Sequence, residues 1–190
     1  MLTSTYTLVA MSVELARARV EVQGLLDGWR PGAWSGEPPS ARQYEQACEA
    51  LRRVSQACHW RKFDKFVLPA LRRRGGEAAA LVAELDDLSR RANAARIAAQ
   101  AAAAEGDPGC LAALEHCCEL LLERLEREEH DVMLLARTMI PVDHWFAIAN
   151  QMLAHDHYQN ENRGAAVGAM GAAPAPDVST RKSEPLPFVN

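Results

Sequence analysis

Glu128 interrupts the apolar face of a segment that otherwise repeats apolar residues at the spacing of an amphipathic helix. That face carries Leu111, Leu114, Cys118, Leu121, Leu125, Val132, Leu135 and Met139. Burial of an unpaired carboxylate costs several kcal/mol, so an inward-facing Glu128 must be protonated, paired with a cation or bound to a metal ion. Arg124 lies four residues earlier on the same side of the helix, which is a spacing that allows an ion pair.

A second polar group, His59, falls on the apolar stripe of an earlier segment, between Ser55 and Phe63. Two helices would then each contribute a polar group to the middle of a bundle, where bundle proteins build metal and cofactor sites. Two other interpretations stay open. His59 could be an ordinary half-buried histidine that bonds a neighbouring group, or a rotated helix could bring Glu128 and Glu129 to the solvent.

These residues are positioned by elements that the sequence predicts to be helical throughout. Apolar periodicity predicts helices over residues 5–29, 40–75, 77–104 and 108–140, and a shorter one over 142–158. Ser40 and Gln43 form a capping-box pattern, Asp107 is placed as an N-cap, and Pro69 should bend the end of the second helix. We therefore predict an all-α fold, an up-down antiparallel four-helix bundle with a short C-terminal helix over residues 1–160, and a disordered tail over 161–190.

Composition excludes several classes of protein. The chain of 190 residues, 48% of them hydrophobic, is long enough for one well-buried domain. Its net charge of -4 gives no general attraction for nucleic acid or for an anionic membrane, and the basic runs at 61–65 and 71–74 are interpreted as solvated faces. With neither a secretory signal nor a membrane-spanning run, the chain is expected in the cytoplasm, with five reduced cysteines in its core.

Three stretches resemble the hemerythrin-like (HHE cation-binding) domain family. "CHWRKFDKFVLPALRRRG" (58–75) is similar to the family's His-rich helix with its apolar-Pro-Ala-Leu turn, and "LLLERLEREEHDVMLLA" (120–136) is similar to its fourth helix. "MIPVDHWFAIANQM" (139–152) resembles the family's closing segment, so the resemblance spans roughly residues 45–152. It implies an up-down four-helix bundle with a non-haem di-iron centre and ancestral iron or oxygen binding.

Most of the ligands that the resemblance implies are missing from this chain. His59 and Glu128 keep family positions, whereas Phe63 and Arg124 stand where the family has a glutamate and a histidine. The histidines of this chain are His59, His116, His130, His144, His155 and His157. None lies in the first or third predicted helix, although a di-iron site needs about five or six ligands from all four helices. We therefore expect Arg124 to neutralise Glu128 in place of a metal ion, with His59 across the bundle.

A second resemblance belongs to another functional class. "QACHWRKFDKF" (56–66) is similar to the single-histidine segment of the bacterial regulators of sigma factor, which bind a subunit of RNA polymerase. "ERLEREE" (123–129) is similar to their Arg-x-x-x-Glu-acid helix, and this resemblance accounts for Arg124.

The sequence thus predicts a bacterial, cytoplasmic helical bundle that acts as a binding or regulatory module for an unidentified protein partner. No nucleophile with a neighbouring base, phosphate loop or nucleic-acid motif is present, so we expect neither an enzyme nor a resident cofactor. Two alternatives remain. One is an anti-sigma type regulator, and the other is a metal-binding protein with a non-standard ligand set of His59, Glu128 and Cys58.

Overall fold

The computed structural model describes the backbone of residues 2–29, 39–59 and 61–171, and the side chains of residues 5–29, 39–58 and 61–158. Every element in these ranges is helical, so the predicted all-α class is confirmed for the described part of the chain. None of the described helices combines the length and the hydropathy that a membrane span requires.

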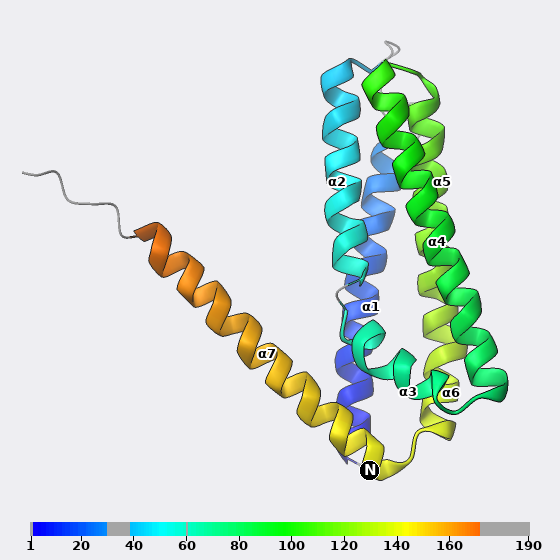
Figure 1. Ribbon diagram of the computed structural model, residues 1–190, viewed down its shortest axis with the longest axis vertical. Coiled ribbons are helices and arrows are strands. Elements are labelled where there is room, and N and C mark those ends of the chain that lie inside the picture. Colours follow the sequence, from blue (N-terminus) through cyan, green and yellow to red (C-terminus); the bar gives the residue numbers. More distant parts are fainter. Residues whose placement is uncertain (1, 30–38, 60, 172–190) are drawn as a thin grey trace, which may run out of the picture. The chain divides into compact units, whose positions relative to one another are not determined.

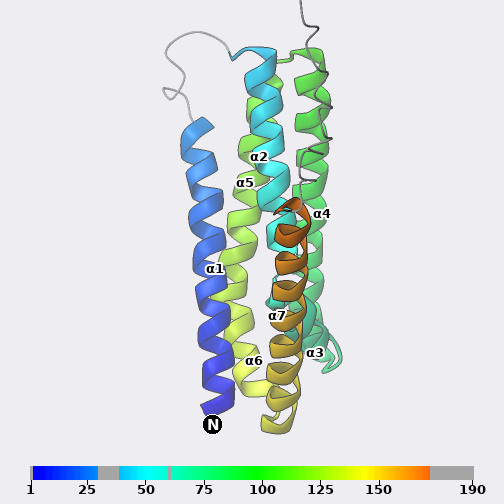
Figure 2. The same ribbon diagram turned by 90° about the vertical axis from the view of Figure 1, so that its left-hand side faces the viewer.

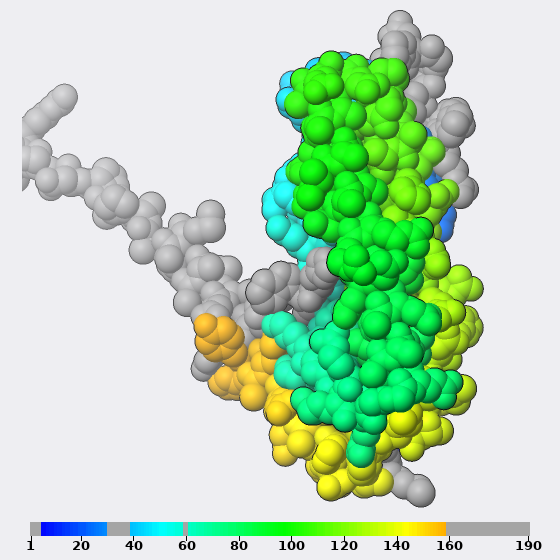
Figure 3. Space-filling model, turned by 45° about the vertical axis from the view of Figure 1, so that its right-hand side comes forward, coloured from blue at the N-terminus to red at the C-terminus, as the bar shows by residue number. Residues whose placement is uncertain are grey.

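Four long helical segments lie side by side and alternate in direction along the chain (Figures 1 and 2). They are α1 (Leu2–Trp29), α2 (Ala41–His59), α4 (Gly76–Glu105) and α5 (Gly109–Arg127). Helix α1 packs against α2 and α5, and α4 packs against the same two helices. The four segments therefore enclose one core, and side chains of α4 cover much of the face shown in Figure 3.

The second predicted helix is not continuous, which corrects the expectation of one helix with a bend at Pro69. Helix α2 ends at His59, and the chain continues through a π-helix, η1 (Phe63–Val67), and a short helix, α3 (Leu68–Arg72). Pro69 lies in the first turn of α3, directly after η1, at a position where helices tolerate proline. The break thus precedes the proline, and Gly75 and Gly76, both at positive φ, lead into α4.

The fourth predicted helix runs through a second π-helical segment. Helix α5 continues into η2 (Glu128–Val132) and then into α6 (Met133–Met139). The Met133 N–H bonds the Glu128 carbonyl, and in η1 the Leu68 N–H bonds the Phe63 carbonyl, both with the i to i+5 spacing of a π-helix. Each π-helix widens one turn and changes the direction of the side chains that follow it.

Two of the predicted helix starts use the expected side chains. The Gln43 amide oxygen accepts a hydrogen bond from the Ser40 backbone N–H at 2.8 Å, which is one half of the predicted capping box. The Asp107 carboxylate accepts one from the Gly109 N–H at 2.8 Å, although α5 itself begins at Gly109.

Helix α7 (Val142–Gly171) is longer than the predicted 142–158, so residues 161–171, which we assigned to a disordered tail, are helical. Residues 172–190, the rest of the predicted tail, lie outside the described residues. By its internal contacts the chain divides into a unit ending at Leu153, which contains the bundle, and a second unit beginning at Ala154.

Candidate functional site

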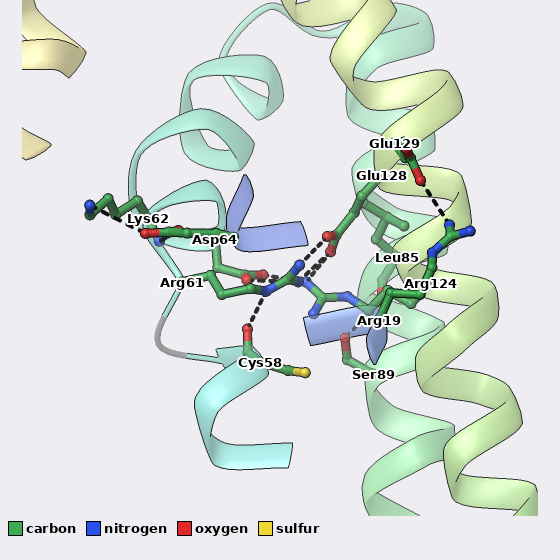
Figure 4. A network of polar contacts seen from close by, with 11 residues as sticks. Arg19, Cys58, Arg61, Lys62, Asp64, Leu85, Ser89, Arg124, Glu128 and Glu129 are labelled. Carbon is green, nitrogen blue, oxygen red and sulfur yellow. Dashed lines mark hydrogen bonds and ion pairs between the residues drawn. The ribbon is translucent and has the colours of Figure 1, made fainter. Parts of the chain in front are cut away.

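A buried cluster of two guanidinium groups and two carboxylates lies inside the bundle (Figure 4). Glu128 from η2 is 0% exposed, and Arg124 from α5 is 4% exposed. Arg61, which follows the break after α2, is 6% exposed, and Asp64 from η1 is 15% exposed. The charges of the four side chains balance, as burial of ionised groups requires.

Arg61 is at the centre of this cluster because its guanidinium reaches three acceptors. Its Nη2 donates to Glu128 Oε1 at 2.8 Å, and its Nη1 lies 2.6 Å from Glu128 Oε2. Its Nη2 also lies 3.2 Å from Asp64 Oδ2, and its Nε donates to the Cys58 carbonyl at 2.8 Å. The last bond satisfies a backbone acceptor at the C-terminal end of α2, so one side chain both caps that helix and neutralises Glu128.

Arg124 completes the cluster from the opposite side. Its Nη2 lies 3.2 Å from Glu128 Oε1, four residues along the same helical segment, and it also bonds Asp64 Oδ1. The predicted pair of Arg124 and Glu128 is therefore present as a contact, with Arg61 as a second cation that the sequence did not indicate. Glu128 faces the core and Glu129 faces the solvent, so the alternative of a rotated helix does not occur.

Burial and charge act in opposite directions on these groups. Burial raises the pKa of Glu128 above the ordinary glutamate value, and Arg61 and Arg124 lower it in part. Burial also disfavours the charged form of Arg61, but attraction to Glu128 and Asp64 outweighs this effect and raises its pKa. Arg61 therefore remains a cation across the pH range in which proteins are studied.

The described residues around Glu128 do not fit the iron centre that the first resemblance implies. A metal ligand must offer a lone pair, and the groups that contact both Glu128 oxygens are guanidinium groups, which have only N–H donors. Among the described side chains, no group of three or more His, Cys, Asp or Glu is placed to hold a metal ion. His59 is the last residue of α2, and its side chain lies outside the described residues.

Two members of the cluster, Arg61 and Asp64, were missed by the sequence reasoning. The run at 61–65 was interpreted as a solvated basic face, which is wrong for Arg61 because that side chain is buried. In a continuous helix Asp64, which directly follows Phe63 of the apolar stripe, would lie one step out of phase with that stripe. The break after α2, followed by η1, removes this mismatch. The available signal was the Arg61–Asp64 pair itself, an arginine and a carboxylate three residues apart.

Comparisons with protein-family models, with curated proteins and with solved structures found no match to this chain.

All five cysteines are buried free thiols, as predicted. Cys117 Sγ donates to the Ala92 carbonyl at 3.1 Å and so links α5 to α4. Burial raises the pKa of Cys110, of Cys117 and of Cys118 to about 12 in each case. Native thiols that remain protonated are poor nucleophiles, which indicates a packing role for them.

We expect these thiols to make the fold sensitive to alkali. Between pH 9 and 12 the unfolded chain loses thiol protons that the native chain keeps, so the free energy of unfolding falls as pH rises. Each such thiol contributes a slope of at most about 1.4 kcal/mol per pH unit. Urea titrations of the wild type and of Cys117→Ala over this range should show the stability difference between them shrinking. If the unfolding free energies of the two proteins fall in parallel with pH, the Cys117 thiol does not contribute to the alkaline loss of stability.

Proposed function

We propose that this chain is a helical-bundle interaction module that pairs with a second copy of itself through the outer face of α1. The observation that carries the proposal is that α1 is apolar on two sides. Its inner side is buried in the bundle through Leu8, Met11, Leu15, Ala18, Val22, Leu26 and Trp29. Its outer side exposes a second apolar row, which we call the outer seam, formed by Tyr6, Val9, Val13, Ala16 and Val20.

The outer seam has the spacing of a coiled-coil seam, because its residues are separated alternately by three and four positions. Tyr6 is 70%, Val9 57%, Val13 45% and Val20 72% exposed. Isolated exposed apolar residues are common on protein surfaces, but a row at heptad spacing on one helix favours contact with another helix.

A hollow on the outer seam indicates what the partner helix must supply. Val13, Ala16, Arg17, Val20 and Glu21 line a depression of about 380 Å³, and the first four stand at positions i, i+3, i+4 and i+7. Four residues in this arrangement form the hole that receives a side chain from a facing helix. Ala16 leaves the hole wide enough for a large side chain.

A second copy of the chain carries a large side chain, Tyr6, at the N-terminal end of its own outer seam. In an antiparallel pair related by a two-fold axis, Tyr6 of each copy reaches the hole of the other, and Val9 packs against the other copy's Val13. A two-fold axis makes such a contact occur twice, so one surface serves as both partners. The outer seam is shorter than three heptads, so we expect a weak dimer with a Kd of about micromolar or higher.

Analytical ultracentrifugation of the full chain at protein concentrations of about 1–500 μM measures its mass on both sides of the expected Kd and so tests the pairing. The wild type should move from monomer to dimer, and Val13→Glu should remain monomeric because it places a charge in the outer seam. Ile97→Glu is the matched control, since Ile97 is 52% exposed on α4 and lies outside the outer seam. A monomeric wild type, or a dimer lost equally in both variants, would refute the proposal.

Thiol cross-linking tests the antiparallel register. A mixture of Val9→Cys and Val13→Cys chains should cross-link more efficiently than either variant alone, because the two positions face each other only between copies. Efficient cross-linking of Val13→Cys alone would instead indicate a parallel pair. Cross-linking to a different protein from the native host would favour the regulatory alternative that resembles the regulators of sigma factor.

We also propose that the module folds without a resident metal ion, because Arg61 and Arg124 already supply the positive charge that Glu128 and Asp64 need. The hemerythrin-like ancestry and the cytoplasmic location remain predictions from the sequence.

Elemental analysis of protein purified without chelator should therefore give far less than one iron or zinc per chain. Treatment with a chelator should leave the unfolding temperature unchanged. One metal ion per chain that is lost in His59→Ala would instead support the alternative with a non-standard ligand set.

A further inference from the structure

A second hollow of the bundle unit, separate from the buried cluster, lies between α1 and the turn from α6 into α7. This pocket has a volume of about 460 Å³. Its innermost walls are Leu8, Ile140 and Trp145, which are 7%, 4% and 2% exposed. Val9 and Val142 are 57% and 56% exposed and form part of its rim. Thr5 and Ser12, both exposed, also line the pocket, so it has an apolar floor and a mouth that is partly polar.

Among the described residues that line this pocket, Arg137 is the one cation, and none is acidic. Within the part of the chain that the structure describes, Arg137 makes neither an ion pair nor a hydrogen bond through its side chain. Arg137 is an exposed residue, like other arginines without a partner such as Arg42, whereas Arg61 and Arg124 are buried and paired with carboxylates. An arginine without a partner beside an apolar cavity leaves a guanidinium fork available to an anion from outside.

We propose that this pocket binds a small monocarboxylate with a compact apolar body, such as an aryl-substituted short-chain acid. The planar guanidinium of Arg137 matches a carboxylate in two parallel hydrogen bonds. A single cation matches a single negative charge, and the floor of Leu8, Ile140 and Trp145 receives the apolar body. The volume lies within the range of roughly 300–1,000 Å³ that is usual for small-molecule sites.

Calorimetry and ligand-observed NMR with 3-phenylpropionate and its neutral amide test the proposal on the full chain. The acid should bind up to about fivefold more tightly than the amide, which is the upper end of what one exposed ion pair contributes. Arg137→Gln should reduce the affinity for the acid to that for the amide and leave the amide unchanged. Val142→Glu places a carboxylate at the exposed rim and should abolish binding of the acid without affecting the core.

Arg42→Gln is the matched control, because Arg42 is an exposed arginine on α2 that does not line the pocket. It should bind the acid as the wild type does. The proposal is overturned if 3-phenylpropionate, hexanoate and indole-3-acetate all fail to bind at millimolar concentration, or if acid and amide bind equally. Equal losses in Arg42→Gln and Arg137→Gln would also overturn it. Because the site shares only Val9 with the outer seam, loss of α1 pairing in Val13→Glu should leave acid binding intact.

Discussion

Replacement of Glu128 by glutamine is expected to lower the free energy of unfolding by about 3–5 kcal/mol. The substitution keeps the size of the side chain but removes the charge that faces Arg61 at 2.6 Å and Arg124 at 3.2 Å. Two buried guanidinium groups then share Asp64 as their remaining described carboxylate partner in the cluster. An uncompensated buried charge is much more costly than a lost surface pair.

Glu129→Gln is the matched control for this experiment, one residue along the same segment. Glu129 pairs with Arg19 at 2.9 Å, but its side chain is 53% exposed, so its loss should change stability by at most about 1 kcal/mol. Denaturant titrations of both variants measure the difference. If the two glutamines cost the same, Glu128 is not the buried partner of the two arginines.

Periodicity predicted the parts of the fold that regular α-helices determine. The apolar stripes gave the extents of α1 and α4 closely, and that of α5, η2 and α6 taken together, and they placed Glu128 inside the bundle although its side chain is charged. Arg124 followed from spacing within one helix, since residues four apart share a face. The rule that residues four apart share a face holds wherever the chain keeps the period of a regular α-helix.

The rest of the cluster depends on two departures from that period. Arg61 is buried because α2 ends at His59, which allows its guanidinium to return to the Cys58 carbonyl. Asp64 points inward because it lies in η1, whose turns are wider than those of an α-helix. A projection with a constant helical period ignores the end of α2 and the wider turn of η1. It therefore places Asp64 out of phase with the apolar stripe, and Arg61 was interpreted as a solvated charge.

The two faces of α1 illustrate a different limit of sequence patterns. The helix is apolar on both sides, and the side that packs against α2 and α5 forms part of the core. Leu26 is buried, whereas the neighbouring Leu25 is only partly buried against the core. The outer seam became visible only once the inner side had been assigned.

The buried pair of Arg61 and Glu128 gives the sharpest test of how the cluster holds together, because removing both charges should be less harmful than removing either. Arg61→Met alone leaves Glu128 and Asp64 to share Arg124, and Glu128→Leu alone leaves two cations with Asp64. Each single variant should lose about 3–5 kcal/mol. In the double variant Arg124 and Asp64 remain paired, so no uncompensated charge stays buried.

A double-mutant cycle of Arg61→Met and Glu128→Leu measures this coupling. The double variant should be more stable than either single variant, with an interaction energy of about 3 kcal/mol or more between the two sites. Loss of the bond from Arg61 Nε to the Cys58 carbonyl should keep the double variant below the wild type. Additive losses would mean that the two side chains act independently. In that case Arg61 would stabilise the bundle by capping α2, and Glu128 by its contact with Arg124.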